Sequence, residues 1–93
     1  MNVIFRFRAS GRVQGVGFRR FVQKTAQSSG VTGWVRNNID GTVSVEACGP
    51  ESVVDAFVKR VEAGSFLARV DSIEPIERRE YLEDLPESFI ITA

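Results

Sequence analysis

The residues best suited to chemistry stand together in one short run near the start of the chain. Residues 11–19 read GRVQGVGFR. Glycine tolerates positive φ angles and close approach by a ligand, so the glycines allow a turn with inward-pointing N–H groups. Arg19 follows at the expected start of a helix, where unpaired N–H groups and the helix dipole favour an anion. The run predicts a cradle for a small anion such as phosphate, although ordinary turns before helices are also rich in glycine.

Composition bounds the setting of this chemistry. The 93 residues include 12 basic and 12 acidic side chains, one cysteine and no histidine. The zero net charge offers no electrostatic footprint for DNA or RNA. A single cysteine excludes an intramolecular disulfide, and no leader or long apolar run is evident, so we expect a cytoplasmic protein without a membrane segment. The length suits a single domain, which we expect to span residues 1–93.

Hydrophobic periodicity predicts the elements that position the cradle. Apolar residues alternate over residues 3–9, which is typical of a half-buried strand. From Phe18 to a stop near Gly30 they recur with the period of an amphipathic helix. Residues 31–37 and 42–48 then predict two strands joined by a turn at residues 38–41. The cradle should therefore lie between the first strand and the first helix.

Three cations lie off the apolar face of this first helix, namely Arg19, Arg20 and Lys24. For Arg20 and Lys24 we expect a solvated helix surface. Arg19 differs because it occupies the first turn, where a cation opposes the helix dipole unless an anion is held there.

The second half of the chain completes an α+β pattern. A second helix should follow Pro50 and stop near Gly64, and an edge or bulged strand should cover residues 68–80 around Pro75. Residues 88–92 predict a short closing strand. One-sided helices must cover one face of a sheet, so we expect a ferredoxin-like βαββαβ sandwich. Its sheet should be mainly antiparallel, with two helices on one face and a short extra C-terminal strand.

Two sets of residues at fixed spacing carry a family resemblance. The first set comprises Gly11, Val13, Gly15, Val16, Phe18 and Arg19. The second set comprises Gly33, Trp34, Asn37, Gly41, Val43 and Gly49. At this spacing the chain resembles the acylphosphatase family, which carries a Gly-x-Val-x-Gly-Val-x-Phe-Arg motif near its N-terminus. The similarity is strong in the first half, looser afterwards, and poor around residues 65–67 and Pro75.

The resemblance implies an activity and roles for individual residues. It implies hydrolysis of acyl phosphates to a carboxylate and inorganic phosphate. It implies that the phosphate is held by Arg19 together with the backbone of Val13, Gln14, Gly15, Val16, Gly17 and Phe18. It also implies that Asn37 orients the attacking water. Without the motif, a cap on its own backbone would be the preferred interpretation of an asparagine beside a turn, and the motif match reverses that preference.

The available side chains limit the reaction mechanism. Without histidine, paired thiolates or an acidic cluster spaced for a metal, the sequence gives little support to a phosphoenzyme or a metal-assisted route. An acyl phosphate departs as a weakly basic carboxylate, so direct attack by water needs positioning and charge stabilisation but no general acid. We expect metal-independent hydrolysis without a cofactor. Cys48 should be a small buried hydrophobe.

The expected partners follow from this reaction. They are a small-molecule acyl phosphate as substrate and inorganic phosphate as product or inhibitor. We expect a monomer that binds neither nucleic acid nor membrane.

Two other functions and one further contact remain open at this point. RNA-recognition domains share the expected fold, but they stack bases on aromatic residues of the third strand, and residues 42–48 contain none. The chain also resembles the acylphosphatase-like domain at the front of a carbamoyl-transferring hydrogenase maturation factor. Finally, the carboxylate of Ala93 could orient Arg19, as the terminal carboxylate does in some family members.

Overall fold

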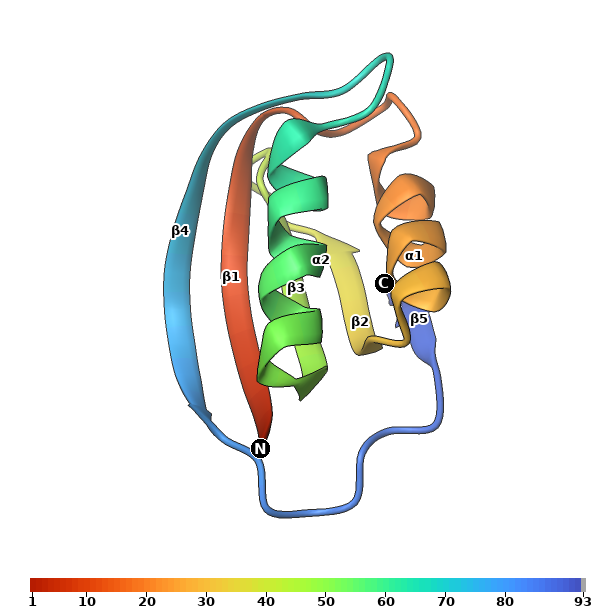
Figure 1. Cartoon of the computed structure of the whole chain (residues 1–93). Helices are drawn as coiled ribbons and strands as arrows, with labels where there is room; N and C mark the ends of the chain where they lie inside the picture. Colours follow the sequence, from red (N-terminus) through yellow and green to blue (C-terminus); the bar gives the residue numbers. More distant parts are fainter. Residues whose placement is uncertain (93) are drawn as a thin grey trace.

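The computed structural model describes residues 1–92 and shows seven elements in the predicted order (Figure 1). The elements are β1 (Asn2–Arg12), α1 (Phe18–Ser29), β2 (Thr32–Asn37), β3 (Val43–Pro50), α2 (Glu51–Ala63), β4 (Arg69–Glu80) and β5 (Phe89–Ile91). The strands form one sheet in the order β4-β1-β3-β2-β5. Within residues 1–92, the pairing of β5 with β2 is parallel and the other strand pairings are antiparallel. This arrangement confirms the predicted ferredoxin-like α+β fold.

The core lies between the sheet and the two helices, which cover the same face of the sheet (Figure 1). Alternate residues of β3 are buried there, beginning with Val43 and Val45. The side of α1 that includes Val22 is buried, as is the side of α2 that includes Phe57. Burying an aliphatic or aromatic side chain of this size stabilises the folded state by roughly 1.5–3 kcal/mol. The predicted one-sided helices are confirmed, because each buries its apolar stripe in this core.

Strand β4 is an irregular edge strand, as predicted. In the described part of the chain it pairs only with β1, and the register shifts twice along the pair, between Arg6 and Phe7 and between Ser10 and Gly11. At the second shift Gly11 has a φ of 126°, and an added Cβ would collide with the carbonyl oxygen of Arg69. Gly11 therefore belongs to β1 and allows close approach of β4, outside the cradle loop itself.

Several boundaries differ from the predicted ones by one to three residues. Strand β1 extends to Arg12 because residues beyond Ala9 still pair with β4. Strand β3 extends to Pro50, which precedes the first residue of α2, Glu51. Pairing with a neighbouring strand sets these ends, and a hydrophobic pattern in a single segment does not contain that information.

The topology brings two distant loops to one end of the sheet. Strands β1 and β2 both run antiparallel to β3, so they point in the same direction. The loop that follows β1 and the C-terminal end of β2 therefore lie at the same end of the sheet. Within residues 1–92, no helix is both long enough and apolar enough to cross a membrane.

Candidate active site

The loop between β1 and α1, residues 13–17, is shaped by two glycines in the left-handed conformation. Gly15 has a φ of 75° and Gly17 a φ of 74°. Gly17 is the N-cap of α1 and, having no side chain, leaves the first-turn N–H groups without a capping acceptor. The first turn also contains no acidic residue. The positive end of the α1 dipole is therefore available to an anion.

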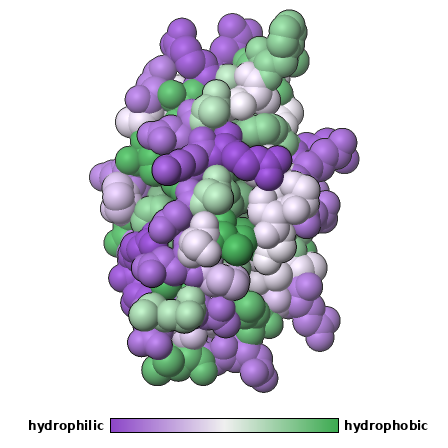
Figure 2. Space-filling model, viewed as in Figure 1, coloured by the Kyte–Doolittle hydropathy of each residue, from purple (hydrophilic) through white to green (hydrophobic). Residues whose placement is uncertain are grey.

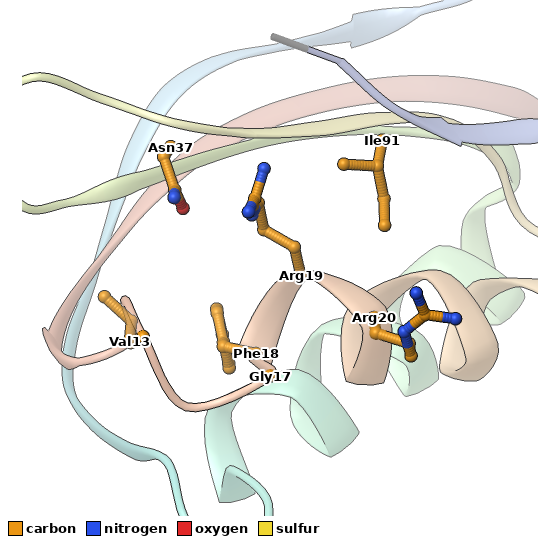
Figure 3. Close-up of a pocket in the computed structure, with 8 residues that line it drawn as sticks. Val13, Gly17, Phe18, Arg19, Arg20, Asn37 and Ile91 are labelled. Carbon is orange, nitrogen blue, oxygen red and sulfur yellow. The ribbon is translucent and has the colours of Figure 1, made fainter.

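A cavity of about 330 Å³ opens at this helix end. Its lining residues are Val13, Gly15, Gly17, Phe18, Arg19, Arg20, Asn37 and Ile91. We call this space the Arg19 cavity. The structure thus brings together most of the residues predicted for the site, from the loop, α1 and β2 (Figure 3). Gln14 and Val16 are exceptions, because neither lines the cavity and Val16 packs against the core instead.

Arg19 rises from the first turn of α1 and is partly buried. Its guanidinium group lies between Asn37 and Ile91 in the close-up view (Figure 3). Within residues 1–92, no salt bridge joins Arg19 to a carboxylate. The hypothesis that Ala93 orients this arginine lies outside the described residues. A guanidinium at a helix start strengthens the local preference for an anion, since charge and dipole act in the same direction.

Asn37 is the last residue of β2, and its side chain points toward the same cavity (Figure 3). Its Oδ1 atom is buried and has no hydrogen-bond partner among residues 1–92. Leaving a buried carbonyl oxygen without a donor costs about 1–3 kcal/mol. An amide oxygen held in this state beside an anion site is suited to accept a hydrogen bond from a water molecule or a ligand.

Gln14 connects the loop to the turn between β2 and β3. Its Nε2 atom donates to the carbonyl oxygens of Asn38 and Thr42, each at 2.9 Å. Asn38 Nδ2 donates in turn to Thr42 Oγ1 at 2.9 Å and to Ser44 Oγ at 2.8 Å. This network fixes the loop relative to the turn that begins directly after Asn37. Sequence reasoning assigned Gln14 only a backbone contact, because nothing local indicates a bond to residues 24 and 28 positions away.

Two lining residues were missed at the sequence level. Arg20 was predicted to be solvated helix surface, and it is exposed, but it also lines the rim of the cavity. Ile91 also lines the cavity, because β5 pairs with β2 and places Ile91 opposite Val35, two residues before Asn37. The third position of a helix and the end of a short strand carry no distinctive pattern, so only the fold could reveal either residue.

Cys48 takes no part in the Arg19 cavity. It is buried in β3, as predicted, and burial together with the nearby Glu46 carboxylate raises the pKa of its thiol to about 11. A thiol with this pKa is a poor nucleophile near neutral pH. Over residues 1–92, no group of three or more histidine, cysteine, aspartate or glutamate side chains is placed to hold a metal ion.

Comparison with known proteins gives consistent results. The acylphosphatase family model matches residues 5–91. The acylphosphatase of Rhizobium etli is 44% identical over 91 residues, covering 98% of this chain and 95% of the relative. That of Geobacillus thermodenitrificans is 53% identical over 74 residues, covering 80% of this chain and 78% of the relative.

Two solved structures are also similar to this chain. The crystal structure of acylphosphatase from Bacillus subtilis matches with a TM-score of 0.90 at 40% identity, covering 98% of this chain and 99% of that one. The structure of full-length HypF with phosphate and nucleotide bound matches with a TM-score of 0.82 at 30% identity. The match to HypF covers 100% of this chain but only 12% of that protein.

Proposed function

The chain belongs to the acylphosphatase family, and from this premise we propose that the Arg19 cavity is the site where it hydrolyses acyl phosphates. The family supplies the reaction, which converts an acyl phosphate into a carboxylate and inorganic phosphate. The observation that carries our assignment of the site is the buried Asn37 Oδ1, which lacks a partner within residues 1–92 and borders the same cavity as Arg19.

In this proposal, the phosphoryl group is bound by Arg19 and by the backbone N–H groups of residues 13–18. The uncapped first turn of α1 supports this role, because its N–H groups and dipole favour negative charge. Phosphoryl transfer spreads charge over the equatorial oxygens, so fixed donors on several sides stabilise the transition state. Gln14 contributes indirectly by holding the loop against the turn after Asn37.

Asn37 would orient the attacking water through its side-chain oxygen. An acceptor oxygen opposite a bound phosphoryl group can accept a hydrogen bond from water. This contact directs the lone pair of the water oxygen at phosphorus. The carboxylate product is a weak base, so it departs without a general acid. The cavity lining includes arginine and asparagine side chains and no acidic residue. This lining is compatible with an attacking water oriented by Asn37 and with a leaving group that needs no general acid.

Several further properties belong to the proposal. Hydrolysis should proceed without a metal ion or other cofactor, and inorganic phosphate should bind as product and inhibitor. The protein should act as a monomeric single domain in the cytoplasm, without binding nucleic acid. The donor set supports metal independence, since residues 1–92 lack a cluster of metal-ligating side chains.

The assay uses purified protein with benzoyl phosphate and a simple phosphate monoester, each with and without excess EDTA. We expect rapid turnover of benzoyl phosphate in EDTA, competitive inhibition by inorganic phosphate and much slower turnover of the monoester. Equal rates on both compounds would refute the proposal that the site depends on a weakly basic leaving group. Loss of benzoyl phosphate hydrolysis in EDTA would refute metal independence.

A further inference from the structure

A second hollow lies along α1 and adjoins the Arg19 cavity. It has a volume of about 560 Å³ and is lined by Gly17, by one side of α1 and by Arg60 of α2; the α1 residues are Arg20, Phe21, Lys24, Thr25 and Ser28. We call it the α1 groove. Gly17 and Arg20 line both spaces. In the close-up view, Arg20 lies farther along the helix than Arg19 and extends away from it (Figure 3). A molecule held at Arg19 could therefore extend into the α1 groove past Arg20.

The α1 groove concentrates positive charge. Its lining includes Arg20, Lys24 and Arg60 and no acidic residue. Helix α1 itself contains no aspartate or glutamate. Hydrophilic side chains cross the upper part of the helix-bearing face in the space-filling view (Figure 2). Low-dielectric walls and one sign of charge focus the field within such a groove.

Most arginines of the sheet, in contrast, are paired with carboxylates. Within residues 1–92, each arginine in a salt bridge lies on β1 or β4, and these are Arg6, Arg8, Arg69, Arg78 and Arg79. The three cations of the α1 groove appear in none of those pairs. A general excess of positive charge does not explain this contrast, because the chain has a net charge of zero. The groove is thus a local site where negative charge is missing.

The far end of the groove is fixed by hydrogen bonds. Arg60 Nη1 donates to Ser29 Oγ at 3.0 Å and to Ser28 Oγ at 3.5 Å. These bonds hold the guanidinium group of Arg60, a residue of α2, against the C-terminal end of α1. The partly buried Phe21 adds an apolar lining residue between Arg20 and Lys24 in the sequence. Lys24 follows Arg20 by four residues, so both lie on the same face of α1, about 6 Å apart along the helix axis. A short apolar chain could span this distance.

From these features we propose that the α1 groove binds a second anionic group, carried at the far end of the acyl part of the substrate. The preferred substrates would then be acyl phosphates whose acyl chain ends in a carboxylate or a phosphate. Arg20, Lys24 and Arg60 would supply the positive charge, and Phe21 would contact the chain. This inference rests on the proposed function of the Arg19 cavity, because that cavity must hold the reacting phosphoryl group.

The test compares succinyl phosphate with butyryl phosphate, which has the same carbon chain but lacks the terminal carboxylate. We expect the wild-type protein to show a higher kcat/KM for succinyl phosphate. The Lys24→Gln variant should lower the succinyl-to-butyryl ratio about two- to fivefold, the range of exposed ion pairs. The matched control is Lys59→Gln, because Lys59 is an exposed lysine of α2 that does not line the groove. This control should keep the wild-type ratio.

Ionic strength gives a second readout, which a loss of folding would not mimic. Added salt should lower the wild-type ratio toward that of Lys24→Gln, because screening weakens the exposed contact. Equal kcat/KM values for the two substrates in wild-type protein, at low salt, would overturn the inference while leaving the proposed function intact. A ratio that falls equally in Lys24→Gln and Lys59→Gln would also overturn it. If wild-type protein hydrolyses neither compound, the proposed function fails and this inference fails with it.

Discussion

Replacement of Asn37 by alanine should separate catalysis from stability. The Asn37 Oδ1 atom is buried and unpartnered within residues 1–92, so the folded protein already bears part of its desolvation cost. Removing this side chain should lower the free energy of unfolding by less than about 1 kcal/mol, or should raise it. The reason is that the desolvation cost of the unpaired carbonyl, about 1–3 kcal/mol, is removed with it. Turnover should fall on the order of 10², equivalent to about 2.7 kcal/mol of lost transition-state stabilisation.

The neighbouring Asn38 provides a matched comparison. Its amide donates to Thr42 and Ser44 and does not line the Arg19 cavity. Asn38→Ala should therefore lower the free energy of unfolding by about 1–3 kcal/mol while reducing turnover less than Asn37→Ala does. Urea unfolding and steady-state hydrolysis of benzoyl phosphate measure the two quantities. Near-normal turnover in Asn37→Ala, with Asn38→Ala the slower enzyme, would refute the water-orienting role.

Three further variants test the phosphate site. Arg19→Gln should weaken inhibition by inorganic phosphate and lower kcat/KM, by about 1.5–3 kcal/mol for a lost charge-assisted contact; unchanged inhibition would remove Arg19 from the site. Gly17→Ala and Gly30→Ala should each lower the free energy of unfolding by about 1–2 kcal/mol, because both glycines adopt the left-handed conformation. Only Gly17→Ala should also weaken phosphate binding. Equal phosphate inhibition constants for the two variants would contradict this. Gln14→Ala should raise KM and the phosphate inhibition constant, whereas a variant that loses stability alone would show that Gln14 does not position the loop.

The secondary structure could be predicted because local patterns and tertiary packing agree. Alternation from Val3 to Ala9 and the helical spacing after Phe18 each identify the face that the fold buries. Gly30 ends α1 in the left-handed conformation, as a C-terminal glycine commonly does. The irregular edge strand was also predictable, because Pro75 cannot donate to a central ladder.

The site could be predicted only in part, for a physical reason. Arg19 and Asn37 stand within sequence motifs, and the topology places both beside one cavity. Three contributions depend on segments far apart in the chain, namely the Gln14 bonds to the β2–β3 turn, the position of Ile91 and the groove between Arg20 and Arg60. Such contacts arise from strand pairing and helix packing, and no local periodicity encodes them.

The central claim is that water attacks phosphorus, and not the acyl carbon, in the Arg19 cavity without help from a metal ion. The most direct measurement is a single experiment in water enriched in heavy oxygen, with benzoyl phosphate as substrate and excess EDTA present. We predict undiminished turnover, with the heavy oxygen incorporated into inorganic phosphate and none in benzoate. Label in the benzoate would place the attack at the acyl carbon and contradict the account, as would a reaction that stops in EDTA and resumes when a divalent cation is restored.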